Sequence, residues 1–303
     1  MSLRLITVAI LLAGCASASP SPSPSPVPTA TPSPTAVPSP TPIPLDQAML
    51  ARRFTVLVVG ADSNATRRER GEDVNTDALM VVSVSADKSR IAMMSLPRDT
   101  VDIPMPDGSI YHGKVNGIAQ RLGIEALRGA MATLIGQPID RYVRIDMDDF
   151  VWMVDAVGGI DVEVETRISD SAVHLFLEPG PAHLDGRQAL AFSRTRADSD
   201  YRRAGRQQQV LVALARRWLD PGLAGLMASV QVLGSLQTDI ELDELPTLLE
   251  IGRRSASAEV SGIVLQPPRF SLFVGFEPNS TRGWVMIPNV PEIRAYASLV
   301  LSD

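Results

Sequence analysis

The stretch Phe54-Thr-Val-Leu-Val-Val-Gly60 is a continuous apolar run, rich in β-branched residues, that ends in glycine. Such a run is typical of a β-strand that is buried on both faces, because neither face carries polar residues that would meet water. Two more strands are predicted after it, at residues 78–85 and 90–96, joined by a turn around Asp87-Lys88. This part of the chain therefore predicts the centre of a sheet.

Helices alternate with strands in the rest of the chain. Helical periodicity covers residues 124–135 and 147–157, and strands at 142–145 and 160–164 flank the second helix. The remaining predictions are helices at about 203–219, 223–233, 242–253 and 291–301, and strands at 261–265 and 271–276. This alternation predicts the α/β fold class, with a single three-layer α/β/α domain around a central mixed sheet over residues 51–303.

The N-terminus has the pattern of an export signal. Arg4 precedes an apolar run over residues 5–12, which is too short to span a bilayer, and the run ends in Leu12-Ala-Gly-Cys15. That ending resembles the lipobox of bacterial lipoproteins, in which the cysteine is acylated. We expect residues 1–15 to be a lipoprotein signal peptide and Cys15 to carry the lipid; an ordinary secretory signal is the alternative. With one cysteine, the chain can form no internal disulfide.

Residues 20–44 alternate proline with small and hydroxyl residues and contain no charged or aromatic side chain. Such a segment cannot bury a core, and proline favours an extended conformation of about 3.1 Å per residue. We therefore expect residues 16–50 to be a disordered tether. Its reach would be on the order of 80 Å.

The charge of the chain excludes one class of partner and favours another. A formal net charge of -6 argues against nucleic acid, which needs a basic face. The positive charge is nearly all arginine, since Lys88 and Lys114 are the only lysines. Arginine is suited to bidentate contacts with phosphate groups.

Polar residues gather in four segments. Asp62 and Asp77 stand at the ends of two predicted strands, where α/β sheets bind ligands, and carboxylates suit Mg²⁺ when phosphate oxygens complete its shell. Each could instead cap a turn or a strand. Arg98 follows the third strand, and Lys114-Val-Asn116 enters a short helix whose N-terminus can bind an anion. Arg98 could instead form a surface salt bridge with a neighbour such as Asp99, and the Lys114 segment could be a solvated loop followed by an N-cap.

The fourth segment has the highest density of charge. Two arginines two residues apart would share one face of a strand, and two arginines three residues apart would share one face of a helix. Together they could enclose a multiply charged anion, although a charge run of this kind is usually a solvated face. The segment contains Arg194, Arg196, Asp200, Arg203, Arg206, Gln207 and Gln208.

In their order along the chain, these segments resemble the LytR-CpsA-Psr (LCP) family of bacterial envelope proteins. The matching motifs begin with Gly60-Ala-Asp62, Asn75-Thr-Asp77, Ser95-Leu-Pro-Arg98-Asp99 and Lys114-Val-Asn116, and continue with the Gly158-Gly159 segment, residues 184–196 and residues 200–208. The chain departs from the family pattern at Phe192, where the motif has tyrosine, and at Thr76. A further departure is the lipobox, because the family more often has a transmembrane helix.

The resemblance implies a phosphotransferase that moves a glycopolymer from a polyprenyl-pyrophosphate carrier to a hydroxyl of peptidoglycan. Asp62 and Asp77 would hold Mg²⁺ or Mn²⁺, and Asp200 would orient an arginine or act as a base. The pyrophosphate would be bound by Arg98, Lys114, Arg194, Arg196, Arg203, Arg206, Gln207 and Gln208. Helices around residues 124–135 and 210–226 could line a groove for the lipid. The protein would act on the extracytoplasmic face of the cytoplasmic membrane, held there by its lipid anchor.

Two other functions use the same residues. A pyrophosphatase would hydrolyse the lipid-linked pyrophosphate with water in place of the acceptor. A binding or regulatory module would hold polyprenyl phosphates without turnover; the presence of both Asp62 and Asp77 counts against it.

Overall fold

A computed structural model describes residues 44–70, 75–219 and 236–301. In these residues the largest sheet is six-stranded, with the strand order β11-β6-β1-β2-β3-β12. Antiparallel pairs join β1 to β2, β2 to β3 and β11 to β6, whereas β6 runs parallel to β1 and β12 parallel to β3. The strands are β1 (Phe54–Ala61), β2 (Thr76–Val84), β3 (Arg90–Ser95), β6 (Arg141–Ile145), β11 (Gln237–Thr238) and β12 (Glu259–Val264). The predicted mixed sheet is confirmed.

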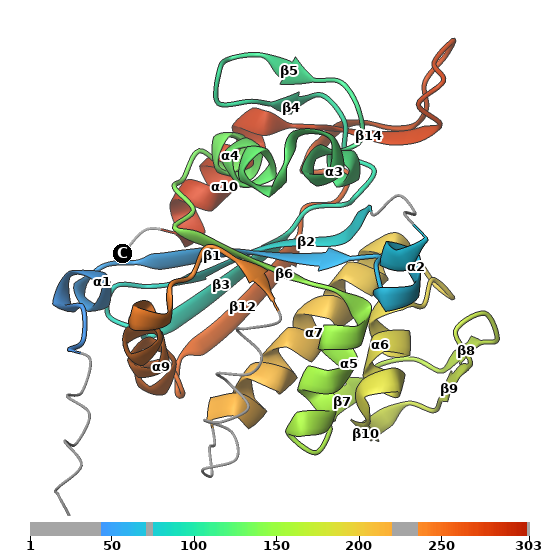
Figure 1. The fold of residues 1–303 in the computed structure, drawn as a ribbon. Helices are drawn as coiled ribbons and strands as arrows, with labels where there is room; N and C mark the ends of the chain where they lie inside the picture. Colours follow the sequence, from blue (N-terminus) through green and yellow to red (C-terminus); the bar gives the residue numbers. More distant parts are fainter. Residues whose placement is uncertain (1–43, 71–74, 220–235, 302–303) are drawn as a thin grey trace, which may run out of the picture. The chain divides into compact units, whose positions relative to one another are not determined.

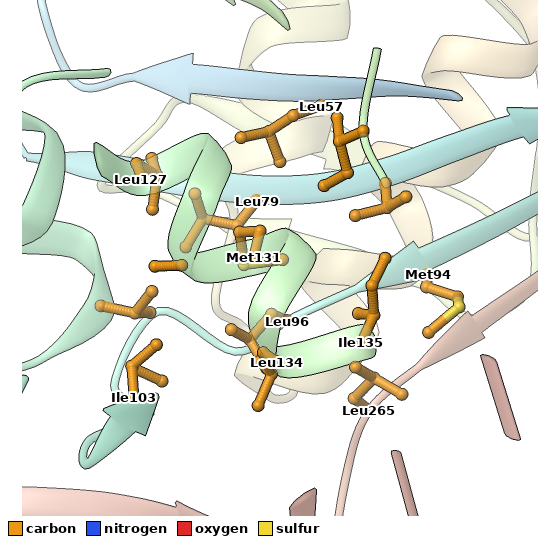
Figure 2. Close-up of a cluster of buried hydrophobic side chains, with 14 of the residues drawn as sticks. Leu57, Leu79, Met94, Leu96, Ile103, Leu127, Met131, Leu134, Ile135 and Leu265 are labelled. Atoms are coloured by element: carbon orange, nitrogen blue, oxygen red, sulfur yellow. The ribbon is translucent and has the colours of Figure 1, made fainter. Parts of the chain in front are cut away.

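One face of the sheet carries the main apolar core. Alternate residues of β1, Leu57 and Val59, are fully buried on this face together with Leu79 and Val81 of β2. Helix α4 (Ile124–Ile135) lies across them, and Figure 2 shows its Leu127, Met131, Leu134 and Ile135 side chains pointing at the strands. Helices α3 (Ile118–Leu122) and α10 (Val290–Val300) complete the layer. Because side chains alternate along a strand, the remaining β1 residues face the other layer.

The opposite face of the sheet is covered by α5 (Met147–Ala156), α6 (Gly186–Arg194) and α7 (Asp200–Leu219) (Figure 1). These helices form a second core, which includes Val154, Phe192, Val210 and Leu214. The chain is therefore a three-layer α/β/α fold, as predicted. The strand expected at residues 160–164 is present as β7 (Ile160–Val164), but it pairs with β10 (Gly180–Leu184) outside the main sheet.

The other described elements are short. They are α1 (Gln47–Ala51), α2 (Ala65–Glu69), β4 (Ile103–Pro104), β5 (Ile110–Tyr111), η1 (Val115–Gly117), β8 (Ile168–Asp170), β9 (Leu175–Leu177), η2 (Leu242–Glu244), α9 (Leu245–Arg254), β13 (Ser271–Phe276) and β14 (Trp284–Pro288). None of the described helices is long and apolar enough to cross a membrane.

The folded part begins before the boundary that the sequence suggested. Asp46 caps α1 by accepting hydrogen bonds from the backbone amides of Ala48 and Met49. Met49 and Leu50 are buried in a small core with Ile251 of α9, so residues up to 50 do not all belong to a tether. Cys15, the predicted signal peptide, most of the predicted tether and the helix expected at 223–233 lie outside the described residues.

Candidate active site

Three of the predicted segments meet at one end of the sheet. Asp62 follows β1 directly, Asp77 is the second residue of β2, and Arg98 lies three residues beyond β3. Since β1 and β3 each run antiparallel to β2, both of them end where β2 begins. The backbone amide of Asp62 donates to Asn75 at 2.9 Å, which closes this end of the β1–β2 pair. The antiparallel pairing therefore brings Asp62, Asp77 and Arg98 to one place.

The fourth segment reaches the same end of the sheet from the second helical layer. Arg194 is the last residue of α6, Asp200 is the first residue of α7, and Arg196 lies in the link between them. The expectation that Arg194 and Arg196 lie on a strand is wrong. Asp185 begins a helix instead, because its side chain and that of Gln188 form a reciprocal capping box.

Arg98 is the centre of an ionic network, which we call the sheet-end cluster. Its Nη1 donates to Asp77 Oδ1 at 2.8 Å, and its Nε lies 3.7 Å from Asp99 and 3.9 Å from Asp200. Lys114 Nζ donates to the other oxygen of Asp99 at 2.6 Å. Burial disfavours the charged form of Arg98, but the three carboxylates outweigh it and raise the pKa of the guanidinium. The cluster comprises Asp62, Asp77, Arg98, Asp99, Lys114, Arg194, Arg196, Asp200 and Arg203.

Asp200 links three arginines of the cluster without a close hydrogen bond to any of them. Its carboxylate lies 3.5 Å from Arg196 and 3.6 Å from Arg203, in addition to the contact with Arg98. No described residue donates a hydrogen bond to this carboxylate. Its oxygens can therefore accept a hydrogen bond from a hydroxyl group of a ligand.

Arg203 is a buried cation that lacks a hydrogen-bond partner for its Nε. Only 5% of the residue is exposed, and burial lowers the pKa of the guanidinium. Among the described residues, Arg98 Nε and the Tyr201 hydroxyl are also buried without a hydrogen bond. Leaving such groups unpaired costs about 1 to 3 kcal/mol each. Two of the three groups belong to Arg98 and Arg203, which both pair with Asp200, and this indicates a site that a polar ligand completes.

Asp62 is held by two arginines, one of which the sequence did not single out. Arg67 of α2 contacts Asp62 Oδ2 at 2.6 Å, and Arg194 contacts Oδ1 at 3.1 Å. The other unforeseen members of the site are Asp99 and Tyr201. The signal for Asp99 was its place beside Arg98 in the family motif; nothing in the sequence pointed to Arg67 or Tyr201.

The carboxylates fit a divalent cation only in part. Asp62 and Asp77 line the same pocket and are hard oxygen donors, but in this structure Asp62 pairs with Arg194 and Asp77 with Arg98. Among the described residues, no group of three or more histidine, cysteine or acidic side chains is arranged to hold a metal. The donor set therefore suits an ion whose remaining ligands are phosphate oxygens and water, as Mg²⁺ commonly has.

An apolar pocket runs from the sheet-end cluster between the sheet and the second helical layer. Its floor includes Val58 and Met80, and its wall includes Phe150, Val210 and Leu214. The carboxylates of Asp62 and Asp77, Arg194 and Gln207 form its polar end. The predicted groove is present along α7 but not along α4, whose apolar side chains are packed into the main core. Residues 220–226 lie outside the described residues.

A second pocket contains the cationic side chains. Arg194, Arg196 and Arg203 line it, together with Asp77 and Gln207. Since Asp77, Arg194 and Gln207 belong to both pockets, the apolar and the cationic spaces adjoin. This combination can bind a molecule with an aliphatic chain on one side and a multiply charged anion on the other.

Arg206 and Gln208 do not join the cluster, which corrects their prediction as pyrophosphate ligands. Arg206 donates to the carbonyls of Phe192 and Thr195 and forms an ion pair with Asp198 at 2.7 Å. Burial opposes ionisation of Asp198, but the bonds from Arg206 outweigh it and lower the pKa of that carboxyl. Gln208 donates to Ser95 and to the Ile263 carbonyl, so it fixes α7 to β3 and β12. Only Gln207 turns toward the pockets.

Replacing Arg206 by alanine is expected to lower the free energy of unfolding by about 3 kcal/mol. The change leaves Asp198 and two backbone carbonyls without their donor, and a broken buried ion pair costs about 3 to 5 kcal/mol. Urea unfolding followed by circular dichroism would measure the loss. A stability equal to that of the wild type would show that Arg206 does not hold the α6–α7 link.

The fold and the site together define a three-layer α/β/α domain with an apolar pocket beside an arginine cluster. The chain matches the LytR_cpsA_psr family over residues 35–270, and it belongs to that family. The resemblance to the LCP family that the sequence motifs indicated is therefore confirmed.

Relatives with assigned names are distant in sequence. The chain is 28% identical over 249 residues to the polyisoprenyl-teichoic acid–peptidoglycan teichoic acid transferase TagV of Bacillus subtilis, covering 77% of this chain and 62% of the relative. It is 30% identical over 191 residues to the transferase TagU of Bacillus mycoides, and the match covers 62% of this chain and 59% of TagU. It is also 28% identical over 213 residues to the biofilm regulatory protein A of Streptococcus mutans. That match covers 65% of this chain and 52% of the relative. The chain spans about 60% of the length of the two transferases.

Solved structures support the same fold. The crystal structure of Bacillus subtilis TagV superposes with a TM-score of 0.65 and 26% identity, covering 83% of this chain and 98% of that chain. A structure described as TagT bound to LIIa-WTA superposes with a TM-score of 0.64 and 22% identity, covering 83% of this chain and 92% of that chain. At 22% identity, the TagT structure shows that the two chains share a fold and nothing further.

Proposed function

We propose that this chain is a phosphotransferase that moves a glycopolymer from a polyprenyl-pyrophosphate carrier to a hydroxyl group of peptidoglycan. One observation carries the proposal: the apolar pocket and the cationic pocket share Asp77, Arg194 and Gln207. A polyprenyl pyrophosphate has the matching chemistry, with an aliphatic chain joined to two phosphates. The transferases TagV and TagU are distant relatives, which supports the same reading.

Each group has a physical task in this reaction. The aliphatic chain lies in the apolar pocket, and Arg194, Arg196 and Arg203 bind the phosphate oxygens in the cationic pocket. Arg98, which pairs with Asp77 at the edge of both pockets, assists them. Asp62 and Asp77 would hold Mg²⁺, which would offset charge on the pyrophosphate. Lys114 keeps Asp99 in place beside Arg98, and it lies close enough to assist the anion site.

The transfer step exchanges one phosphorus–oxygen bond for another. The acceptor oxygen forms a bond to the phosphorus next to the sugar, while the bond from that phosphorus to the bridging oxygen breaks. Polyprenyl monophosphate leaves with the electron pair, and the hydroxyl proton passes to Asp200, whose oxygens accept no hydrogen bond from the described residues. The product is a phosphodiester between glycopolymer and acceptor.

Reconstitution with purified protein tests the function. A lipid-linked saccharide donor, soluble peptidoglycan fragments and Mg²⁺ are expected to give a phosphodiester-linked product detectable by mass spectrometry. Chelation with EDTA should stop the reaction and added Mg²⁺ should restore it. The double variant Asp62→Asn, Asp77→Asn should not respond to the metal, since it lacks both charged ligands.

Reactions with and without the peptidoglycan acceptor distinguish the proposed function from its two rivals. Release of free saccharide phosphate at an equal rate with and without peptidoglycan fragments would replace the proposal with a pyrophosphatase. Tight donor binding without any Mg²⁺-dependent turnover would replace it with a binding or regulatory module, a class to which the name of the Streptococcus mutans relative belongs.

We further propose that the protein acts on the extracytoplasmic face of the cytoplasmic membrane, anchored by a lipid on Cys15. The sequence Leu12-Ala-Gly-Cys15 and the proline-rich segment after it support this location. Labelling cells with an alkyne fatty acid should modify the wild type and not Cys15→Ser. Equal labelling of both would refute the anchor.

A further inference from the structure

A third pocket adjoins the sheet-end cluster on the side away from the apolar pocket. It is lined by Asn75, Tyr111, Gly113, Lys114, Asn116, Gly117, Gln120 and Arg121. Asn75 precedes β2, and the other residues belong to β5, η1, α3 and the loops beside them, which lie in the layer of α4 (Figure 1). The apolar pocket lies under the opposite face of the sheet, between α5, α6 and α7.

We propose that this third pocket binds the acceptor glycan, so that its hydroxyl enters the cluster opposite the leaving lipid phosphate. The inference rests on the proposed function. In a phosphoryl transfer the attacking and leaving oxygens lie roughly in line on either side of the phosphorus. If the polyprenyl phosphate departs toward the apolar pocket, the attacking hydroxyl must arrive from the other side. The third pocket occupies that side.

The pocket is joined to the phosphate site by direct contacts. Lys114 lines the pocket and donates to Asp99, which lies beside Arg98. The backbone amide of Asn116 donates to the Arg98 carbonyl at 3.4 Å, and the buried Thr76 hydroxyl donates to the Asn116 carbonyl at 3.1 Å. Since Thr76 precedes Asp77, the pocket wall and the cluster are parts of one rigid arrangement.

The lining has the chemistry that recognises a polar sugar. No acidic side chain lines the pocket, whereas Lys114 and Arg121 are cationic and three lining side chains are amides. Within the described residues, the Tyr111 hydroxyl, the Asn116 amide and the Arg121 guanidinium have no hydrogen-bond partner. They can bind hydroxyl and N-acetyl groups, and Arg121 can bind a carboxylate substituent.

Two glycines let the backbone approach the tyrosine. A Cβ atom at Gly113 would lie 2.8 Å from the Tyr111 hydroxyl oxygen, and one at Gly117 would lie 3.4 Å from it. A larger residue at Gly113 would therefore displace the ring from its present position. The Tyr111 ring also packs against the main core, which fixes one wall of the pocket.

Steady-state kinetics of the full protein test the assignment. The variants Asn116→Ala and Arg121→Ala are each expected to raise the KM for soluble peptidoglycan fragments about tenfold, the effect of losing one hydrogen bond to a charged or polar group. The KM for the lipid-linked donor should not move. Both backbone bonds of Asn116 survive its substitution, and Arg121 is exposed, so the fold should be retained. Arg254→Ala, an exposed arginine at the far end of the sheet, is the matched control and should change neither KM.

The outcomes separate the possible ligands. A raised KM for the donor, with that for the acceptor unchanged, would show that the pocket holds the first sugar of the donor, and it would overturn the proposal. No change in either KM would also overturn it. Nuclear magnetic resonance titration of the wild type and both variants with peptidoglycan fragments needs no turnover. If the wild type transfers nothing, the proposed function fails, whereas weaker fragment binding by the variants would still support the pocket.

Discussion

Replacing Arg98 by alanine is expected to reduce kcat/KM for glycopolymer transfer by about a thousandfold, the lower range for an arginine that binds a transferring phosphoryl group. Arg98 contacts Asp77 and lies beside both Asp99 and Asp200, so it connects the carboxylates from three parts of the cluster. The loss would be measured with a lipid-linked donor and peptidoglycan fragments. Arg196→Ala should have a similar effect, because its guanidinium lies between Asp77 and Asp200.

Arg98→Lys distinguishes charge from geometry. Lysine retains the positive charge but not the planar fork that contacts two oxygens at once, so activity should recover only in part. Arg253→Ala, which removes an exposed arginine from a pair with Glu250, is the control and should retain full activity. Activity like that of the wild type in both Arg98→Ala and Arg196→Ala would refute the site.

Filling the apolar pocket is expected to select against long lipids. Val58 faces the pocket from β1, and Val58→Phe adds an aromatic ring inside it. Excluding about three methylene groups from the pocket, at about 0.8 kcal/mol each, should lower kcat/KM for a long polyprenyl donor by roughly 50-fold. A donor with a chain of only two or three isoprene units should be affected much less. The measurement is the ratio of kcat/KM for the two donors.

Val58→Ala is the matched control for this experiment. This change widens the pocket and does not fill it. The ratio of kcat/KM for the long donor to kcat/KM for the short donor should therefore stay close to that of the wild type. Thermal unfolding of both variants would show that the fold is retained. An unchanged ratio in Val58→Phe would place the lipid elsewhere on the protein.

The site was predicted from the sequence in large part, because its residues stand at the ends of regular elements. Asp62, Asp77 and Arg98 each lie beside a strand that has a clear apolar pattern. The ends of antiparallel neighbours meet, so a correct strand assignment already brings these residues near one another. Lys114 joins them through Asp99, the neighbour of Arg98 in sequence.

The errors arose where long-range contacts decide the outcome. The strand expected for Arg194 and Arg196 followed from two arginines spaced two residues apart, whereas the capping box of Asp185 and the burial of Phe192 produce a helix. Arg206 and Gln208 are polar residues of the same helix as Arg203. The packing of α7 alone determines that Arg206 faces the α6–α7 link and that Gln208 faces the sheet, so that neither side chain faces the cationic pocket.

By itself, the sequence determined the fold class, the family and the residue types that can bind a metal ion and phosphates. Apolar periodicity and motif order are local properties, so they can be read along the chain. The tertiary structure decided which arginines are available to a ligand, since it pairs Arg206 with Asp198 and leaves Arg203 buried beside Asp200. It also decided that α7, and not α4, lines the apolar pocket: the two helices lie on opposite faces of the sheet, and which face carries the cavity depends on how all three layers pack.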